Sequence, residues 1–256
     1  DDVRIFYYIL GKHPKLGLTR VFPLRFDDRK GGKDVRSGSR IAVDIGAASA
    51  RMIAGRLSRG RLKMREIHRF PTGDVFLGGQ RVRDLYRWYE EILAGLSRCA
   101  GESGEAPESL GVDAMGEDFV LRNEAGGFLS LPRSYRDPRD IRRVLDEEAR
   151  FGAERIYAIC GNQSVPNDTL RQLIGLRQEQ PRVLEAARGL LFLADSFHYL
   201  LCGNPSIEHS LASYGKLFDL SLNRYSDEIF RAFSLPESLQ SPVCRCGDAL
   251  GPVHPE

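Results

Sequence analysis

This sequence has little of what marks a membrane-spanning, secreted or nucleic-acid-binding protein. Its 256 residues contain no window of about 18 consecutive apolar residues, and no charged, apolar and cleavable leader opens the chain. The 37 basic and 35 acidic residues leave a net charge of only +2. We therefore expect neither nucleic acid nor a membrane as a partner, and a cytoplasmic protein is the default expectation.

Cysteines are scarce, odd in number and scattered along the chain. A chain of this length can bury a core without disulfides, so five isolated cysteines fit a reducing compartment. Cys244 and Cys246 could join His254 in a zinc site, but a fourth ligand is missing. A loop with two free thiols is the favoured interpretation.

Two common nucleotide-binding motifs, G-x-x-x-x-G-K-S/T and G-x-G-x-x-G, are also absent. Instead, a short apolar strand at residues 41–43 ends on a carboxylate and is followed by small residues. A strand end can fix Asp44 so that it holds Mg²⁺ through water, while small residues let backbone N–H groups approach phosphate oxygens. The candidate phosphate-binding residues are Asp44, Gly46, Ala47, Ala48, Ser49, Ala50 and Arg51. An ordinary hairpin with a small-residue turn explains the same string, and this alternative stays open.

The chain divides into stretches of different character. Residues 1–39 have no regular period and are interpreted as an extension or linker. Beyond them, residues 41–43, 51–57 and 62–70 predict a three-stranded antiparallel meander. An amphipathic helix follows, with Trp88 in its apolar stripe, and further strands are expected at residues 110–115 and 118–121. This order indicates an α/β layered domain in which a crossover helix leads to a parallel strand.

Helices are expected to dominate the second half. Asp137 followed by Pro138 predicts a helix start, with the carboxylate as N-cap, and Asp195 is expected to cap another helix that ends at Gly203. His198 and His209 are interpreted as structural histidines.

Several strings, in this order, resemble a known family. They include AVDIGA at residues 42–47 with Arg51, REIHRF at 65–70 and GVDAMGEDFVL at 111–121, then LPRSYRD at 131–137, TLRQL at 169–173 and ADSFHYL at 194–200. Together they resemble the FGGY carbohydrate kinases, and within these the rhamnulokinase branch. The resemblance covers residues 40–256, which correspond to the first of the two lobes of that family.

The resemblance implies a fold, a reaction and a set of site residues. The expected fold is a ribonuclease-H-like lobe of the actin and hexokinase type, with a mixed five-stranded sheet flanked by helices. The implied reaction is transfer of the γ-phosphoryl group of ATP to a ketose sugar resembling rhamnulose, with Mg²⁺ held by Asp44 through water. Gly116 matches the position whose backbone meets the sugar, and Met115 and Glu117 flank it. The general base is expected in the second lobe, not in this chain.

The chain also departs from the family pattern. Where the family has a second glycine the chain has Ala50, and where it has tryptophan followed by Gly-Val-Asp the chain has Met115 and then Gly116, Glu117 and Asp118. A different sugar or a decayed site would each explain these changes. The alternative function is therefore a non-catalytic relative that binds sugar or a protein partner. Sugar and ATP are the expected partners, and a homodimer is left open.

Overall fold

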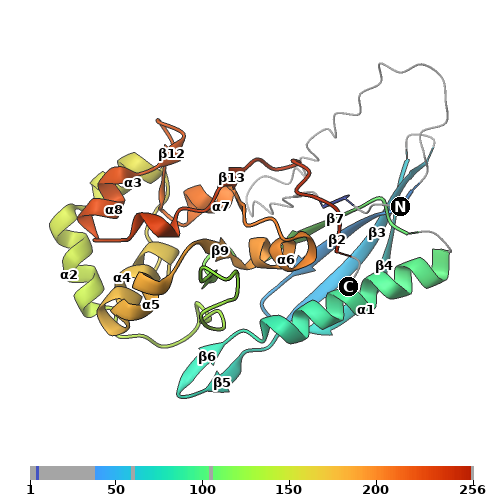
Figure 1. Cartoon of the computed structure of the whole chain (residues 1–256), viewed down its shortest axis with the longest axis horizontal. Helices are drawn as coiled ribbons and strands as arrows, with labels where there is room; N and C mark the ends of the chain where they lie inside the picture. The colour runs from blue at the N-terminus through green and yellow to red at the C-terminus, as the bar shows by residue number, and fades with distance from the viewer. Residues whose placement is uncertain (1–3, 6–37, 59–60, 104–105, 255–256) are drawn as a thin grey trace.

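The computed structural model describes residues 4–5, 38–58, 61–103 and 106–254 (Figure 1). Within these residues, five strands form a mixed sheet in the order β1-β7-β2-β3-β4. The β2, β3 and β4 strands pair antiparallel, whereas β7 runs parallel to both β1 and β2. The bounds are Arg4–Ile5 for β1, Arg40–Ile45 for β2, Ser49–Ser58 for β3, Arg61–Pro71 for β4 and Ser109–Asp113 for β7.

Alternation of side chains fixes which face of the sheet is buried. In β2, Ile41, Val43 and Ile45 are buried, while the residues between them are half-buried. This period of two places successive side chains on opposite faces, as the meander prediction requires. The antiparallel pairing of β2, β3 and β4 confirms the predicted meander. The helix at residues 85–103 and the parallel pairing of β7 with β2 confirm the crossover helix and the parallel strand.

One strand of this sheet comes from the stretch interpreted as an extension, since β1 pairs with β7 through Arg4 and Ile5. Most of residues 1–39 lie outside the described residues. The strand expected at residues 118–121 does form, as β8 (Phe119–Leu121), but it pairs antiparallel with β9 (Leu190–Phe192) outside the main sheet.

Helix α1 (Leu85–Ser103) lies along the sheet (Figure 1). Leu85, Trp88 and Ile92 follow one another at intervals of three and four residues and are completely buried. They share one hydrophobic core with buried residues of β2, β3, β4 and β7, and this core also includes Leu193 and Phe197 of α6 (Leu193–Cys202). The prediction that Trp88 belongs to the core is confirmed.

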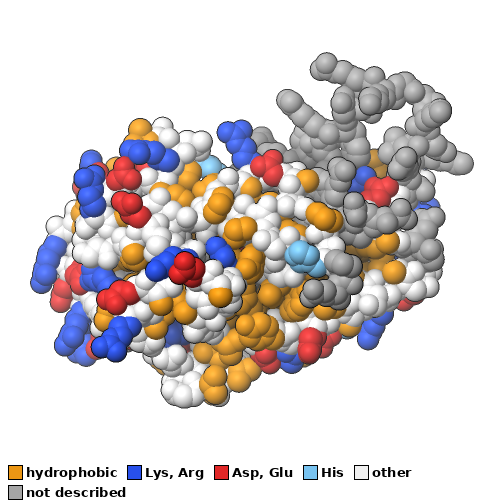
Figure 2. Space-filling view, viewed as in Figure 1, with side chains coloured by type: hydrophobic (Ala, Val, Ile, Leu, Met, Phe, Trp, Pro, Cys, Tyr) orange, Lys and Arg blue, Asp and Glu red, His pale blue; other side chains and the backbone are white. Residues whose placement is uncertain are grey.

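A short hairpin precedes α1. Its strands are β5 (Val75–Leu77) and β6 (Gln80–Val82), and the turn residues Gly78 and Gly79 both have positive φ, which glycine adopts without strain. Phe76 is 68% and Leu77 60% exposed. Figure 2 shows hydrophobic side chains gathered over this hairpin at the lower edge of the molecule.

The second half is largely helical and forms its own core beside the sheet (Figure 1). That core includes Leu170, Leu173 and the apolar strands β8 and β9. The helices are α2 (Arg142–Phe151), α3 (Ala153–Cys160), α4 (Thr169–Glu179), α5 (Pro181–Ala186), α7 (His209–Tyr214), α8 (Asp227–Ala232) and the 3₁₀ helix η1 (Glu237–Leu239). Short strand pairs join β10 (Ile207–Glu208) to β13 (Val243–Cys244), and β11 (Phe218–Asp219) to β12 (Arg224–Tyr225).

Both predicted caps are wrong. Helix α2 begins at Arg142, and the buried carboxylate of Asp137 instead accepts hydrogen bonds from the Arg81 backbone N–H and the Arg133 guanidinium, each at 2.6 Å. Asp195 lies inside the first turn of α6 and accepts from the Glu208 backbone N–H at 3.3 Å. In each case a tertiary partner takes the carboxylate that the local pattern assigns to a helix end. The helix end predicted at Gly203 is confirmed, with φ of 72°.

Among the described residues, no helix combines the length and apolar character needed to cross a membrane.

The α1 interface predicts a specific stability effect. Ile92→Ala should lower the free energy of unfolding by about 2–5 kcal/mol, because it removes buried methyl and methylene groups and leaves a cavity. Urea unfolding followed by the fluorescence of Trp88, the sole tryptophan, measures the change. Leu62→Ala removes an aliphatic side chain of the same size that is 57% exposed, so it should stay within about 0.5 kcal/mol of the unmodified protein. Equal effects would contradict the packing described.

Candidate functional site

Two carboxylates meet at one edge of the main sheet. Asp44 and Asp113 are Cα partners in the parallel pair β2–β7, so each lies at or near the carboxyl end of its strand. Neighbouring strands are about 4.8 Å apart, which brings both side chains to the same edge. Loops follow at residues 46–48 and 114–118. These two loops contain six of the ten site residues expected from the sequence, and the other four lie at the adjoining ends of β2 and β3.

The turn after β2 is held by hydrogen bonds to its own backbone and to Thr72. The Gly46 N–H donates to the Ser49 carbonyl at 3.1 Å, and Thr72 donates through its hydroxyl to the Gly46 carbonyl at 2.6 Å and through its N–H to the Ala48 carbonyl at 3.2 Å. A Cβ on Gly46 would lie 3.1 Å from the Ser49 oxygen, so glycine is favoured by this close approach. Among the described residues, the N–H groups of Ala47 and Ala48 have no hydrogen-bond partner.

Ala50 does not behave as a loop residue. It lies in β3, its side chain is completely buried in the sheet core, and its φ is not positive. The replacement of the second family glycine by Ala50 therefore causes no backbone strain here. Only the backbone of Ala50 could approach a ligand.

Arg51 lies directly across the β2–β3 ladder from Asp44. Its Nε and Nη2 atoms donate to Asp44 Oδ2 at 3.0 and 2.8 Å, and both side chains remain partly exposed. Next to it, Arg69 pairs with Glu66 and lies 3.5 Å from the Ser49 hydroxyl. The edge thus combines two carboxylates with two guanidinium groups, unpaired amides and one hydroxyl.

Asp113 was not singled out as a site residue from the sequence. Burial, and then the nearby charge of Asp44, raise the pKa of Asp113 to about 6. Two carboxylate oxygens at one strand edge are hard donors of the kind that Mg²⁺ prefers. Within the described residues, no cluster of three or more potential metal ligands occurs.

The second loop carries Met115, Gly116 and Glu117, all of them half-buried. The Glu117 carbonyl accepts hydrogen bonds from the side chains of Thr169 at 3.1 Å and Gln172 at 2.9 Å, both on α4. Met115 packs beside the sheet core. Hydrogen bonds from α4 therefore hold the backbone of this loop at Glu117. The Glu117 side chain and Gly116 face α7.

Tyr214, at the end of α7, covers Gly116 and contacts the side chain of Glu117. Its hydroxyl lies 2.7 Å from Glu117 Oε1, and a Cβ built on Gly116 would lie 3.0 Å from the ring. Burial, followed by the hydrogen bond to Glu117, raises the pKa of Tyr214. The sequence contained no sign of this contact, because Glu117 and Tyr214 are 97 residues apart.

Immediately after Glu117, Asp118 forms a completely buried ion pair with Arg83 at 2.7 Å and accepts from the Tyr135 N–H at 2.7 Å. Burial raises the pKa of Asp118 to about 6, and Arg83 opposes that shift. Arg83 also pairs with Asp74. This pairing joins the second loop to the residues between β4 and the hairpin.

A second buried ion pair anchors α4. The Asp168 side chain caps the helix by accepting from the Arg171 N–H at 2.9 Å, and it also pairs with the ammonium group of Lys216. Lys216 donates further to the Ser164 hydroxyl at 2.7 Å. These bonds fix the first turn of α4, which carries Thr169 and Gln172.

The zinc alternative receives no structural support from the described residues. Cys244 is half-buried and donates to the Ile207 carbonyl at 3.3 Å, and none of the five cysteines, all of them among the described residues, forms a disulfide. His198 is completely buried, and its Nε2 accepts from the Val112 N–H at 3.1 Å. His209 interacts with Asn223 at 2.8 Å.

The known proteins whose sequences resemble this chain are carbohydrate kinases. A sequence model of the N-terminal domain of the FGGY family of carbohydrate kinases matches residues 40–256. Rhamnulokinase of Bacteroides thetaiotaomicron is 34% identical over 215 residues, which are 84% of this chain and 44% of that protein. Rhamnulokinase of Pectobacterium atrosepticum is 35% identical over 213 residues, 82% of this chain and 43% of that protein.

The fold also has solved counterparts. The crystal structure of xylulose kinase from Rhodospirillum rubrum matches with a TM-score of 0.73 at 23% identity, covering 85% of this chain and 45% of that one. This likeness confirms the predicted α/β lobe. The chain spans less than half the length of each of these relatives.

The raised pKa of Asp113 predicts a pH-dependent stability difference. Below about pH 4 the carboxyl is protonated in both folded and unfolded chains, so burial of its charge costs nothing. Between the ordinary pKa of 3.8 and the folded value of about 6, the unfolded chain releases its proton first, and the stability of the fold declines as pH rises. Asp113→Asn should therefore raise the melting temperature more at pH 7.5 than at pH 4.

Thermal unfolding at several pH values followed by circular dichroism measures this difference. Asp146→Asn, on the exposed side of α2, controls for the loss of one surface charge. A melting-temperature gain from Asp113→Asn that is the same at both pH values would show that the buried charge has no cost.

Proposed function

Because the chain belongs to the FGGY family of carbohydrate kinases, we propose that it supplies the phosphate-binding and sugar-binding loops of an ATP-dependent kinase that phosphorylates a ketose such as rhamnulose. The observation that carries the proposal is the pairing of Asp44 with Asp113 beside a turn that has unpaired amides. Phosphoryl transfer needs mainly alignment and stabilisation of charge, and this edge has groups for both.

The proposed phosphate contacts are the N–H groups of Ala47 and Ala48 and the hydroxyl of Ser49. Gly46 and Ala50 contribute differently: Gly46 permits the tight turn, and Ala50 anchors the start of β3 in the core. Arg51 forms an ion pair with Asp44, and its guanidinium could exchange this partner for a phosphate oxygen of a bound nucleotide.

Mg²⁺ would be held by Asp44 through water, with Asp113 beside it. The carboxylate oxygens at this edge fit such an ion, since Mg²⁺ keeps several waters and takes one or two carboxylates. When bound, the ion would offset the negative charge of the nucleotide phosphates. Asp44 would orient a water of such an ion, because the strand end keeps the Asp44 carboxylate fixed.

The proposed sugar contacts are Met115, the Gly116 backbone and Glu117. We assign no general base to this chain, in keeping with the family resemblance, which puts it in the second lobe. The activity proposed here therefore belongs to the full-length protein.

Asp44→Ala should reduce the kcat of the full-length protein by about 100-fold or more, because the charge-stabilising arrangement loses its carboxylate. An enzyme-coupled assay for ADP with Mg-ATP and rhamnulose measures the rate. Asp146→Ala, the same change on an exposed face of α2, should leave it unaltered. Full activity of Asp44→Ala, or no turnover of any ketose or polyol by the unmodified protein, would refute the kinase proposal.

A non-catalytic sugar-binding or partner-binding relative is the second candidate. Two contacts favour it: Tyr214 covers Gly116, and Arg51 already occupies Asp44. Calorimetric titration with Mg-ATP and with rhamnulose, before and after Asp44→Ala, separates the two. A kinase gives a nucleotide-binding heat that Asp44→Ala removes, whereas a non-catalytic relative has no such heat to lose.

A further inference from the structure

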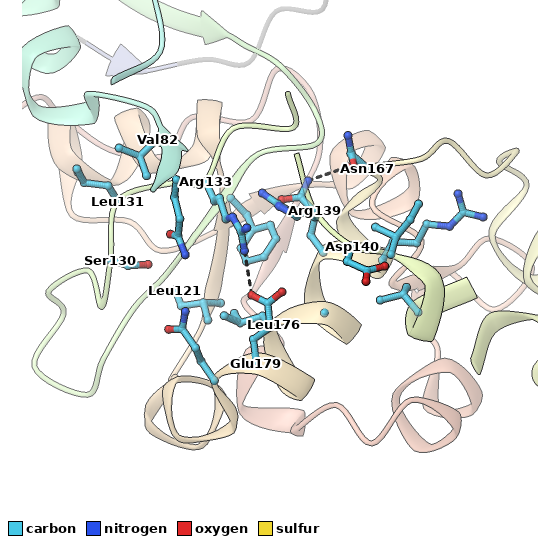
Figure 3. A pocket seen from close by; sticks show the side chains of 18 of the residues that line it. Val82, Leu121, Ser130, Leu131, Arg133, Arg139, Asp140, Asn167, Leu176 and Glu179 are labelled. Carbon is cyan, nitrogen blue, oxygen red and sulfur yellow. Dashed lines mark hydrogen bonds and ion pairs between the residues drawn. The ribbon is translucent and has the colours of Figure 1, made fainter. Parts of the chain in front are cut away.

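A pocket of about 320 Å³ lies between the β5–β6 hairpin and helices α2 and α4, and no residue of the two loops lines it. One part of its wall is apolar and includes Leu121, Val144 and Leu176. Another part carries Arg133 and Arg139, which lie next to each other in Figure 3, with Glu179 opposite Arg133. This volume is at the lower end of the range of small-molecule sites.

Arg139 is the unusual member of this wall. Its side chain is only 9% exposed, its Nε has no hydrogen-bond partner among the described residues, and its one hydrogen bond goes from Nη2 to the Ser134 carbonyl at 3.1 Å. An unsatisfied buried donor on a charged group is costly, so a nearby negative charge would stabilise Arg139.

The carboxylate nearest to Arg139, that of Asp137, already accepts hydrogen bonds from other groups. Asp137 accepts from Arg133 at 2.6 Å and from the Arg81 N–H at 2.6 Å, while Arg139 Nε lies 3.7 Å from it. Two guanidinium groups thus share one carboxylate. Burial, and then repulsion from Arg133, lower the pKa of Arg139 to about 10. An anion in the pocket beside the Arg139 guanidinium would offset this repulsion.

The other charged groups of the pocket form their closest ion pairs with residues other than Arg139. Arg133 also pairs with Glu179 at 3.0 Å, and Arg171 pairs with Glu148 through Nε at 2.7 Å. Asp140 pairs with Arg142 on the exposed side of α2. Among the described residues that line the pocket, Arg133 and Arg171 thus have carboxylate partners within 2.7 Å, whereas the ion pair of Arg139 with Asp137 is 3.7 Å long.

We propose that this pocket, called here the anion pocket, binds a small molecule that carries a carboxylate or phosphate group on an apolar body. The anionic group would contact Arg139, and the body would lie against Leu121, Val144 and Leu176.

The anion pocket is joined to the loop at residues 114–118. Gln172 lines the pocket, and its side chain donates to the Glu117 carbonyl at 2.9 Å and to the Asn167 carbonyl at 2.8 Å. A ligand that moves Gln172 would shift Glu117. Only this regulatory consequence rests on the proposed function; binding itself does not.

Isothermal titration of the whole chain without nucleotide or sugar tests the proposal with four probes. Phenyl phosphate and benzoate have a ring and an anion, benzyl alcohol has the ring alone, and inorganic phosphate has the anion alone. We expect saturable 1:1 binding of one or both ring anions, at least tenfold tighter than benzyl alcohol or inorganic phosphate. The stronger of the two ring anions identifies the anionic group. No saturable binding of either ring anion overturns the proposal.

Variants locate the binding. Arg139→Met should weaken the ring anions at least tenfold, and Gly175→Leu, which extends a side chain from the α4 wall, should abolish binding. Arg155→Gln removes an exposed guanidinium elsewhere and should change nothing, and Arg51→Gln should also change nothing if the probes avoid the Asp44 edge. Unchanged affinity in folded Arg139→Met, or loss of affinity in Arg51→Gln, overturns the proposal.

A measurement on the unmodified chain covers the case in which Arg139→Met or Gly175→Leu fails to fold. Backbone amide signals of Gly175 and Leu176 should shift in nuclear magnetic resonance spectra as benzoate or phenyl phosphate is added. Shifts confined to residues 44–51 would place the probe at the other site and overturn the proposal.

Discussion

The parallel pairing of β2 with β7 is the constraint on which the candidate site depends. It aligns Arg40 with Ser109 at one end and Asp44 with Asp113 at the other. A slip of one residue would turn Ile41, Val43 and Ile45 away from the core, so burial of these side chains holds the register. The proximity of the two carboxylates is thus a consequence of hydrophobic burial. Burial of Asp113, and then the nearby charge of Asp44, raise the pKa of Asp113.

Helix α4 is the second organising element. Its cap, Asp168, is fixed by the buried ion pair with Lys216, and its first turn supports the Glu117 carbonyl through Thr169 and Gln172. Removing one partner of such a pair leaves an uncompensated buried charge, which makes the arrangement intolerant of single changes. A distant helix therefore positions the loop that the family resemblance assigns to the sugar. The hydrogen bonds from α4 to the Glu117 carbonyl join residues 52 and 55 positions apart.

The same helix connects the loop to the anion pocket. Gln172 faces both, and further along α4 the residues Gly175, Leu176 and Glu179 form the pocket wall. The pocket is lined by an incompletely satisfied guanidinium, that of Arg139, whereas the Asp44 edge contains unpaired amides. Both features are places where the fold leaves polar groups without partners, and both are physically suited to anions.

Local sequence by itself determined the β2–β4 meander, the apolar stripe of α1 and the helix end at Gly203, because each follows from spacing or from one residue's backbone preference. The turn at Gly46 could be recognised as well, since close backbone approach requires a small residue. Only the tertiary structure decided what Asp137 and Asp195 bind, that Asp113 stands beside Asp44, that Tyr214 covers Gly116 and that Arg139 is buried without a full set of partners. Except for Arg139, whose partners Ser134 and Asp137 are close in sequence, these contacts join residues that lie far apart along the chain. Their meeting, and the burial of Arg139, depend on how whole elements pack, which short-range patterns do not encode.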